Sequence, residues 1–84
     1  MLTRGEAHRE YGAVLNDLAA LYQWTGEYSK AEPIYLEARE TLRQALGSKH
    51  PDYGTVLGNL ADLYLSIGEG FKAEPLLLEA CKIR

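Results

Sequence analysis

The chain repeats itself with a period of 42 residues. When the 84-residue sequence is shifted by 42 positions, 19 of the 42 aligned pairs are identical, and no gap is needed. The identical pairs extend from Gly5 and Gly47 to Ala38 and Ala80. A fixed period of this size is typical of stacked repeats, in which each unit buries its apolar face against its neighbours. We therefore expect a single domain over residues 1–84, with repeats at about 6–47 and 48–84.

Within each period the apolar residues recur at intervals of three and four, which indicates helices with one apolar face. This pattern predicts helices over residues 6–24, 29–46, 51–66 and 71–84. Gly26 suits the left-handed residue that closes a helix, and Ser29 with Glu32 forms a Ser-x-x-Glu capping box that predicts a helix start at Ser29. Pro51 suits the first position of the third helix. No alternating segment indicates a strand, so the fold class is all-α.

The order of small and large residues resembles the tetratricopeptide repeat. In the first repeat the pattern residues are Leu18, Ala19, Tyr22, Gly26, Tyr28, Ala31, Tyr35 and Ala38. Their counterparts in the second repeat are Leu60, Ala61, Tyr64, Gly68, Gly70, Ala73, Leu77 and Ala80. The 42-residue period resembles the repeat variant found in kinesin light chains. The resemblance includes His50-Pro51-Asp52 before the first helix of a repeat and Ala-Glu-Pro in its second helix. The resemblance implies two stacked antiparallel helix hairpins, as a fragment of a right-handed α-solenoid.

Three positions depart from the pattern. Gly70 stands where the first repeat has the aromatic Tyr28, so we expect a looser or shifted second hairpin turn. His8-Arg9-Glu10 stands where the second repeat has His50-Pro51-Asp52, so we expect the first helix to begin earlier. Arg84 matches Leu42, so the second repeat is truncated at its C-terminal end.

Composition argues against several classes of partner. The formal net charge is −3, and the nine lysine and arginine residues do not cluster, which argues against nucleic acid as a partner. No apolar stretch is long enough to span a membrane, and no segment has the pattern of a secretory signal. The single cysteine, Cys81, fits a reducing compartment such as the cytoplasm.

We expect no catalytic, cofactor or metal site, and hence no enzyme. His8 and His50 are equivalent copies before two helices, which favours a capping or interface role over metal binding. Cys81 aligns with Arg39, so the repeat pattern does not require a thiol there, and a small packed side chain is the simpler interpretation.

In the fold that the resemblance implies, the first helix of each repeat lines a concave groove that holds a peptide. The positions predicted to face this groove are Ala13, Asn16, Ala20, Gln23, Trp24, Thr55, Gly58, Asn59, Asp62, Leu65 and Ser66. Small residues allow a peptide backbone to approach, and amides both donate and accept hydrogen bonds. A clamp for C-terminal carboxylates is disfavoured, because Asn16 and Gly58 occupy the expected lysine positions.

Two alternatives stay open for these positions. They also suit an ordinary solvated helix face, and Trp24 suits either a ligand anchor or a cover for the end of the first helix. The leading hypothesis is a protein–protein interaction module, part of a scaffold or adaptor, that binds a peptide.

The runner-up is a structural unit that forms a homo-oligomer by stacking its terminal helices, since about three repeats are usually needed for a continuous core. The residues expected at its uncovered end are Leu76, Leu77, Ala80, Cys81 and Ile83.

Overall fold

The computed structural model describes the backbone of residues 4–83 and the side chains of residues 7–82. Within this part of the chain there are four helices: α1 (Arg4–Trp24), α2 (Tyr28–Leu46), α3 (Pro51–Ser66) and α4 (Gly70–Ile83). The all-α class is confirmed, and the helix bounds agree with the predicted ones to within two residues. Helix α1 begins earlier than the repeat pattern alone indicates, as the absence of a proline there led us to expect. Ile83, one of the predicted end residues, has a side chain outside the described set.

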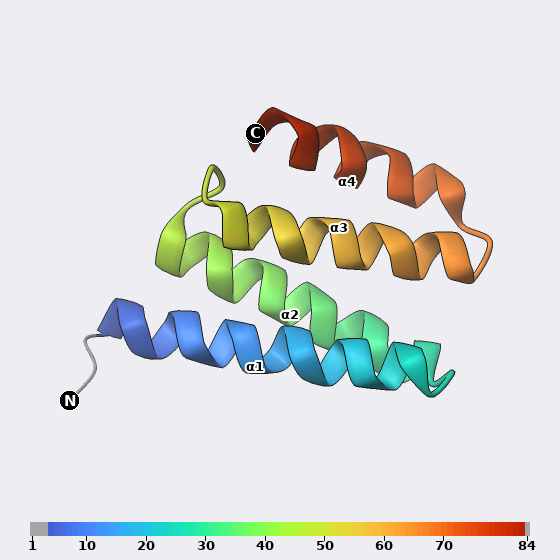
Figure 1. Ribbon diagram of the computed structural model, residues 1–84, viewed down its shortest axis with the longest axis horizontal. Coiled ribbons are helices and arrows are strands. Elements are labelled where there is room, and N and C mark those ends of the chain that lie inside the picture. The colour runs from blue at the N-terminus through green and yellow to red at the C-terminus, as the bar shows by residue number, and fades with distance from the viewer. Residues whose placement is uncertain (1–3, 84) are drawn as a thin grey trace.

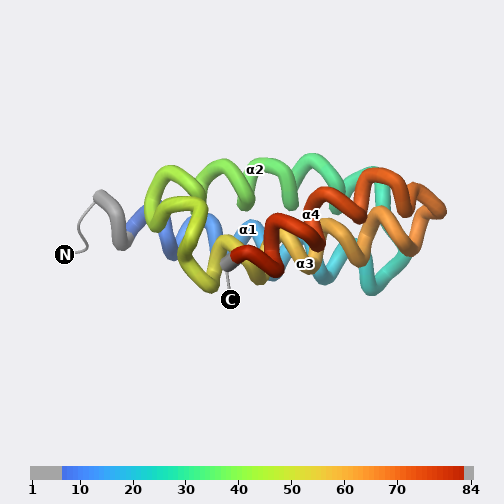
Figure 2. The backbone as a smooth tube through the Cα atoms, turned by 90° about the horizontal axis from the view of Figure 1, so that it is seen from above, coloured from blue at the N-terminus to red at the C-terminus, as the bar shows by residue number. Residues whose placement is uncertain are grey.

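The helices form two antiparallel hairpins that stack side by side (Figure 1). Helix α1 pairs with α2 and helix α3 with α4, and the two hairpins meet mainly where α3 packs against α2. Viewed from above, α2 lies to one side of α1 and α3, so the first helices of the two repeats share a face (Figure 2). This arrangement places the predicted groove positions on neighbouring helices.

Both hairpin turns close in the same way. In the first turn the Glu27 N–H donates to the Tyr22 carbonyl at 2.8 Å, and the Gly26 N–H donates to the Gln23 carbonyl at 3.1 Å. This pair of bonds is a Schellman motif, and it requires a left-handed residue, here Gly26 with φ of 84°. The second turn repeats both bonds, at 2.7 and 3.2 Å, around Gly68 with φ of 81°. The expectation that Gly70 loosens this turn was therefore wrong.

The predicted capping box at Ser29 is also absent. Helix α2 begins at Tyr28, and its N-cap is Glu27, which makes no side-chain capping bond. The Schellman turn explains the difference, because its last residue, Glu27, is already the residue from which the next helix starts. Ser29 consequently lies inside the first turn of α2, where it cannot act as a cap.

The loop between the repeats confirms one predicted cap and corrects another. His50 is the N-cap of α3, where its Nδ1 accepts a hydrogen bond from the Asp52 N–H at 3.1 Å, and Pro51 follows at the first helical position. His8, its counterpart, lies inside α1 and is exposed, so it caps nothing. The physical reason is the missing proline: Arg9 allows the helix to continue toward the N-terminus.

The core consists of two apolar clusters, and Ile34 packs against both of them. Its larger cluster joins residues of all four helices, including Ala19, Tyr35, Leu60 and Ala73, each at most 1% exposed. A smaller cluster joins Leu15, Ala38, Leu42 and Val56 near the loop between the repeats. Helix α3, which contacts all three other helices, carries most of the fully buried large side chains.

Candidate interaction surface

A row of side-chain amides and carboxylates connects α1 to α3 on their shared face. The Asn59 Nδ2 donates to the Asn16 Oδ1 at 3.0 Å, and both side chains are half-buried. The structure thus brings together the asparagine of each repeat, although they occupy adjacent positions of the repeat pattern rather than the same one. Because Asn16 lies on α1 and Asn59 on α3, their hydrogen bond connects the two repeats.

Gln23 makes the second connection, near the hairpin turns. Its Nε2 donates to the Asp62 Oδ2 at 2.7 Å, while its Oε1 accepts from the Tyr35 hydroxyl at 2.8 Å. Burial, together with the negative charge of Asp62, raises the pKa of Tyr35, so its hydroxyl remains a donor at neutral pH. Because Tyr35 is 1% exposed, it fixes the orientation of Gln23 from inside the core.

A crevice of about 190 Å³ opens between the middle of α1 and the N-terminal part of α3. Leu42 and Val56 contribute to its lining from the core, and Ala13 and Thr55 from the two helices. Two carboxylates, Asp17 and Asp52, also line it, and the Arg9 Nε lies 3.3 Å from the Asp52 Oδ2. Since the Arg9–Asp52 pair is exposed to solvent, it adds little to stability.

The remaining predicted groove residues have varied surroundings. Ala20 is half-buried and packs against the larger core cluster. The Thr55 hydroxyl donates to the Pro51 carbonyl within α3. Trp24 is 85% exposed, and Leu65 is 56% exposed beside Gly70 at the second hairpin turn.

The Ser66 hydroxyl donates a hydrogen bond to the Asp62 carbonyl, one turn earlier in α3. No hydrogen bond or core cluster within the described residues connects Trp24, Gly58 or Leu65 to the amide row.

The predicted self-association end differs from expectation at one position. Leu76 is only 7% exposed and belongs to the larger core cluster, because it faces α3. Leu77 is 44% exposed, Ala80 is half-buried and Cys81 is exposed. Ala80 packs against the same core cluster as Leu76, whereas Leu77 and Cys81, four residues apart, lie on a neighbouring and more exposed side of α4.

Sequence reasoning missed the acidic lining of the crevice and the role of Tyr35. Asp17 and Asp52 lie on different helices, and nothing in the sequence of a single helix shows that α1 and α3 converge there. Tyr35 was identified only as a residue of the repeat pattern. A general rule could have predicted this role, because a buried tyrosine hydroxyl usually has a hydrogen-bond partner. Gln23 is a polar residue on the facing helix.

The described residues show neither a metal site nor a membrane span. In residues 7–82, no group of three or more histidine, cysteine, aspartate or glutamate side chains is placed to hold a metal ion. None of the four described helices has the length and apolar character needed to cross a bilayer.

The sequence profile of the family described as Tetratricopeptide repeat matches residues 10–84. No curated protein matches the chain.

Proposed function

The chain belongs to the tetratricopeptide repeat family, and we propose that it binds a peptide segment along the shared face of α1 and α3. Members of this family generally mediate protein–protein interaction and are typically scaffold modules rather than enzymes. The cytoplasm stays the predicted location, on the ground of the single cysteine.

The observation that carries this proposal is the Asn16–Asn59 bond across the two helices. An amide side chain has two donor hydrogens and two acceptor sites, and the bond uses one donor of Asn59 and one acceptor site of Asn16. Both hydrogens of the Asn16 amide and the carbonyl oxygen of Asn59 take no part in this bond. Held in place by each other, the two side chains offer a donor and an acceptor to an extended backbone at low entropic cost.

The crevice beside this pair indicates the composition of the peptide. Its aliphatic residues suit the stem of a lysine or arginine side chain, and Asp17 and Asp52 suit the charged end. A peptide with a basic residue next to its amide-bound segment therefore fits this face better than an acidic one.

The proposal is tested with fluorescein-labelled short peptides that carry either basic or acidic residues at their centre, measured by fluorescence polarisation. We expect the basic peptides to bind more tightly. Asn16→Ala and Asn59→Ala should each weaken binding by about 1 kcal/mol or more, which raises the Kd roughly fivefold. Each variant should lose little thermal stability, because the pair is only half-buried.

Gln44→Ala is the matched control, since Gln44 is an exposed amide on α2 that donates only to Glu40 within its own helix. It should leave peptide binding unchanged. If a peptide that binds the wild-type chain binds both asparagine variants equally well, the site lies elsewhere and the proposal is wrong.

A second function, homo-oligomerisation by end-to-end stacking, is favoured by the exposed apolar residues of α1. Tyr11, Val14 and Leu21 are each at least half exposed, although the same residue types are buried in α3. Side chains of this size on one helix face suit a partner surface. Molar mass measured by light scattering against concentration tests it: the mass should rise with concentration, and a constant monomer mass would exclude it.

A further inference from the structure

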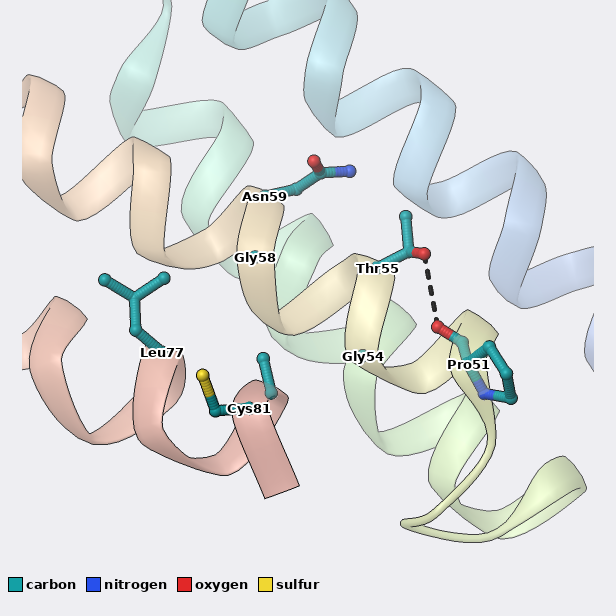
Figure 3. A pocket seen from close by; sticks show the side chains of 8 residues that line it. Pro51, Gly54, Thr55, Gly58, Asn59, Leu77 and Cys81 are labelled. Carbon is teal, nitrogen blue, oxygen red and sulfur yellow. Dashed lines mark hydrogen bonds between the residues drawn. The ribbon is translucent and has the colours of Figure 1, made fainter. Parts of the chain in front are cut away.

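One side of the second hairpin is hollowed between α3 and α4. The hollow has a volume of about 620 Å³, and α4 contributes Leu77, Ala80 and Cys81 to its lining. From α3 it is lined by Thr55 and Gly58, among others (Figure 3). An added Cβ at Gly58 would meet no atom within 4 Å, so nothing in the described chain fills this space. We refer to this hollow as the seat.

The same position in the first repeat is filled, and α3 fills it. Shifted back by 42 residues, Leu77 and Ala80 become Tyr35 and Ala38, and Gly58 becomes Asn16. Ala38 packs in one cluster with Val56 of α3, and Asn16 is bonded to Asn59 of α3. The molecule therefore contains its own example of how such a seat is occupied.

Helix α1 carries the residues that α3 uses to occupy that position. Tyr53, Val56, Leu60 and Leu63 are at most 4% exposed in α3. Their counterparts in α1 are identical residues, and their exposed fractions are 50% for Tyr11, 63% for Val14, 37% for Leu18 and 54% for Leu21. No other described segment repeats this set, so α1 is the one helix of the chain that matches the seat.

We propose that α1 of a second copy docks in the seat between α3 and α4, in the register that α3 adopts against α1 and α2. This inference rests on the second proposed function, to which it adds the occupant and the register. In this register the partner's Val14 lies beside Ala80, as Val56 lies beside Ala38, and the partner's Leu18 lies toward α4. Because the contact joins two different ends, it leaves one seat and one α1 free and can add further copies.

The docked junction lacks the polar pairs that connect α1 to α3 at the internal junction. After the 42-residue shift, the Asn16–Asn59 pair becomes Gly58 with Asp17, Gln23–Asp62 becomes Leu65 with Ala20, and Arg9–Asp52 becomes Pro51 with Glu10. That list contains no hydrogen-bonding pair of side chains. Without these α1–α3 pairs, apolar contact supplies most of the attraction in the stack, which should dissociate on dilution while each chain stays folded.

The experiment uses two variants, each of which damages one side of the contact. Val14→Lys places a charge on α1, and Leu77→Lys places a charge in the seat. Because both side chains are substantially exposed, each variant should fold, and circular dichroism will verify this. Sedimentation velocity should show that either substitution raises the concentration for half-association by at least about tenfold. An equimolar mixture should form a dimer at the wild-type concentration and stop there, since only one intact seat and one intact α1 face can meet.

Phe71→Lys is the matched control, because Phe71 is an exposed apolar residue of α4 outside the seat. Its counterpart in the first repeat, Ser29, is exposed and belongs to neither core cluster, so this variant should associate like the wild type. If the wild type associates but Val14→Lys alone still forms a dimer, two seats meet symmetrically; the stacking function then stands and this register is wrong. A mixture that stays monomeric also overturns the register. A wild-type chain that is monomeric at every concentration overturns both.

Discussion

Helices α1 and α3 have the same residues at four apolar positions but differ in what covers them. In α3, Tyr53, Val56, Leu60 and Leu63 lie in the core, with α2 on one side and α4 on the other. In α1 the identical residues are covered only by α2 or not at all, and they are partly exposed. The comparison teaches that burial in this protein is set by the number of neighbouring helices and not by the helix sequence.

The strongest test of this comparison removes the same leucine from each helix. Leu63→Ala should lower the free energy of unfolding by about 2–5 kcal/mol, because Leu63 is fully buried and its loss leaves a cavity. Leu21→Ala should cost clearly less, about 1 kcal/mol or below, because Leu21 already faces solvent over half its surface. Urea unfolding followed by circular dichroism gives both values, and equal losses would contradict the comparison.

The second test concerns two glycines whose surroundings differ, Gly12 in α1 and Gly58 in α3. A Cβ at Gly12 would lie 2.6 Å from the Cγ of Leu42, which is buried and cannot move aside, so Gly12→Ala should cost about 1–3 kcal/mol. Gly58→Ala in α3 meets open space and should gain about 0.5–1 kcal/mol from better helix propensity.

Chemical denaturation of the two glycine variants measures the difference in sign. In a Leu42→Ala background the cost of Gly12→Ala should shrink, because the clashing side chain is gone. A loss of the same size in both backgrounds would show that the Leu42 contact is not its cause.

The smallest expected difference in stability is between variants of the two histidines, His50 and His8. His50 caps α3 through its Nδ1, so His50→Ala should cost about 1 kcal/mol, whereas His8→Ala, inside an exposed stretch of α1, should change stability by less than about 0.5 kcal/mol. Thermal unfolding of the two variants under identical conditions makes the measurement. His50→Asp should restore most of the loss, because aspartate is also a good N-cap; failure to do so would argue that the ring matters for packing instead.

The sequence predicted the four helices and their pairing, because a 42-residue period and the spacing of apolar residues constrain both. It failed at the start of α2. A capping box and a Schellman turn both place polar residues just ahead of a helix, and only the backbone of Gly26 and Glu27 decides between them. Leu76 was misassigned for a similar reason, since a run of three leucines does not show which one faces α3.

Of the candidate site, the sequence placed Asn16, Gln23, Asn59 and Asp62 on one face but could not pair them. Pairing depends on how closely α1 and α3 converge, and that distance follows from packing against α2. The crevice with Asp17 and Asp52 depends on the same convergence. The exposed faces of α1 and α4 were easier to predict. Each terminal helix carries the apolar residues of the repeat pattern but has no neighbouring repeat in this chain to cover them.

The polar pairs across α1 and α3 have a consequence for the folding of a repetitive chain. Because Tyr11, Val14, Leu18 and Leu21 are identical to their counterparts in α3, hydrophobic contact at these positions does not distinguish α1 from α3. The pairs Asn16–Asn59, Gln23–Asp62 and Arg9–Asp52 do not repeat, and so they distinguish the correct neighbour from its copy. We expect a variant without them to exchange hairpins between chains on refolding, visible as domain-swapped dimers that are separable by size. The repeated apolar residues would then supply most of the attraction between helices, while these few polar contacts determine which helix packs beside which.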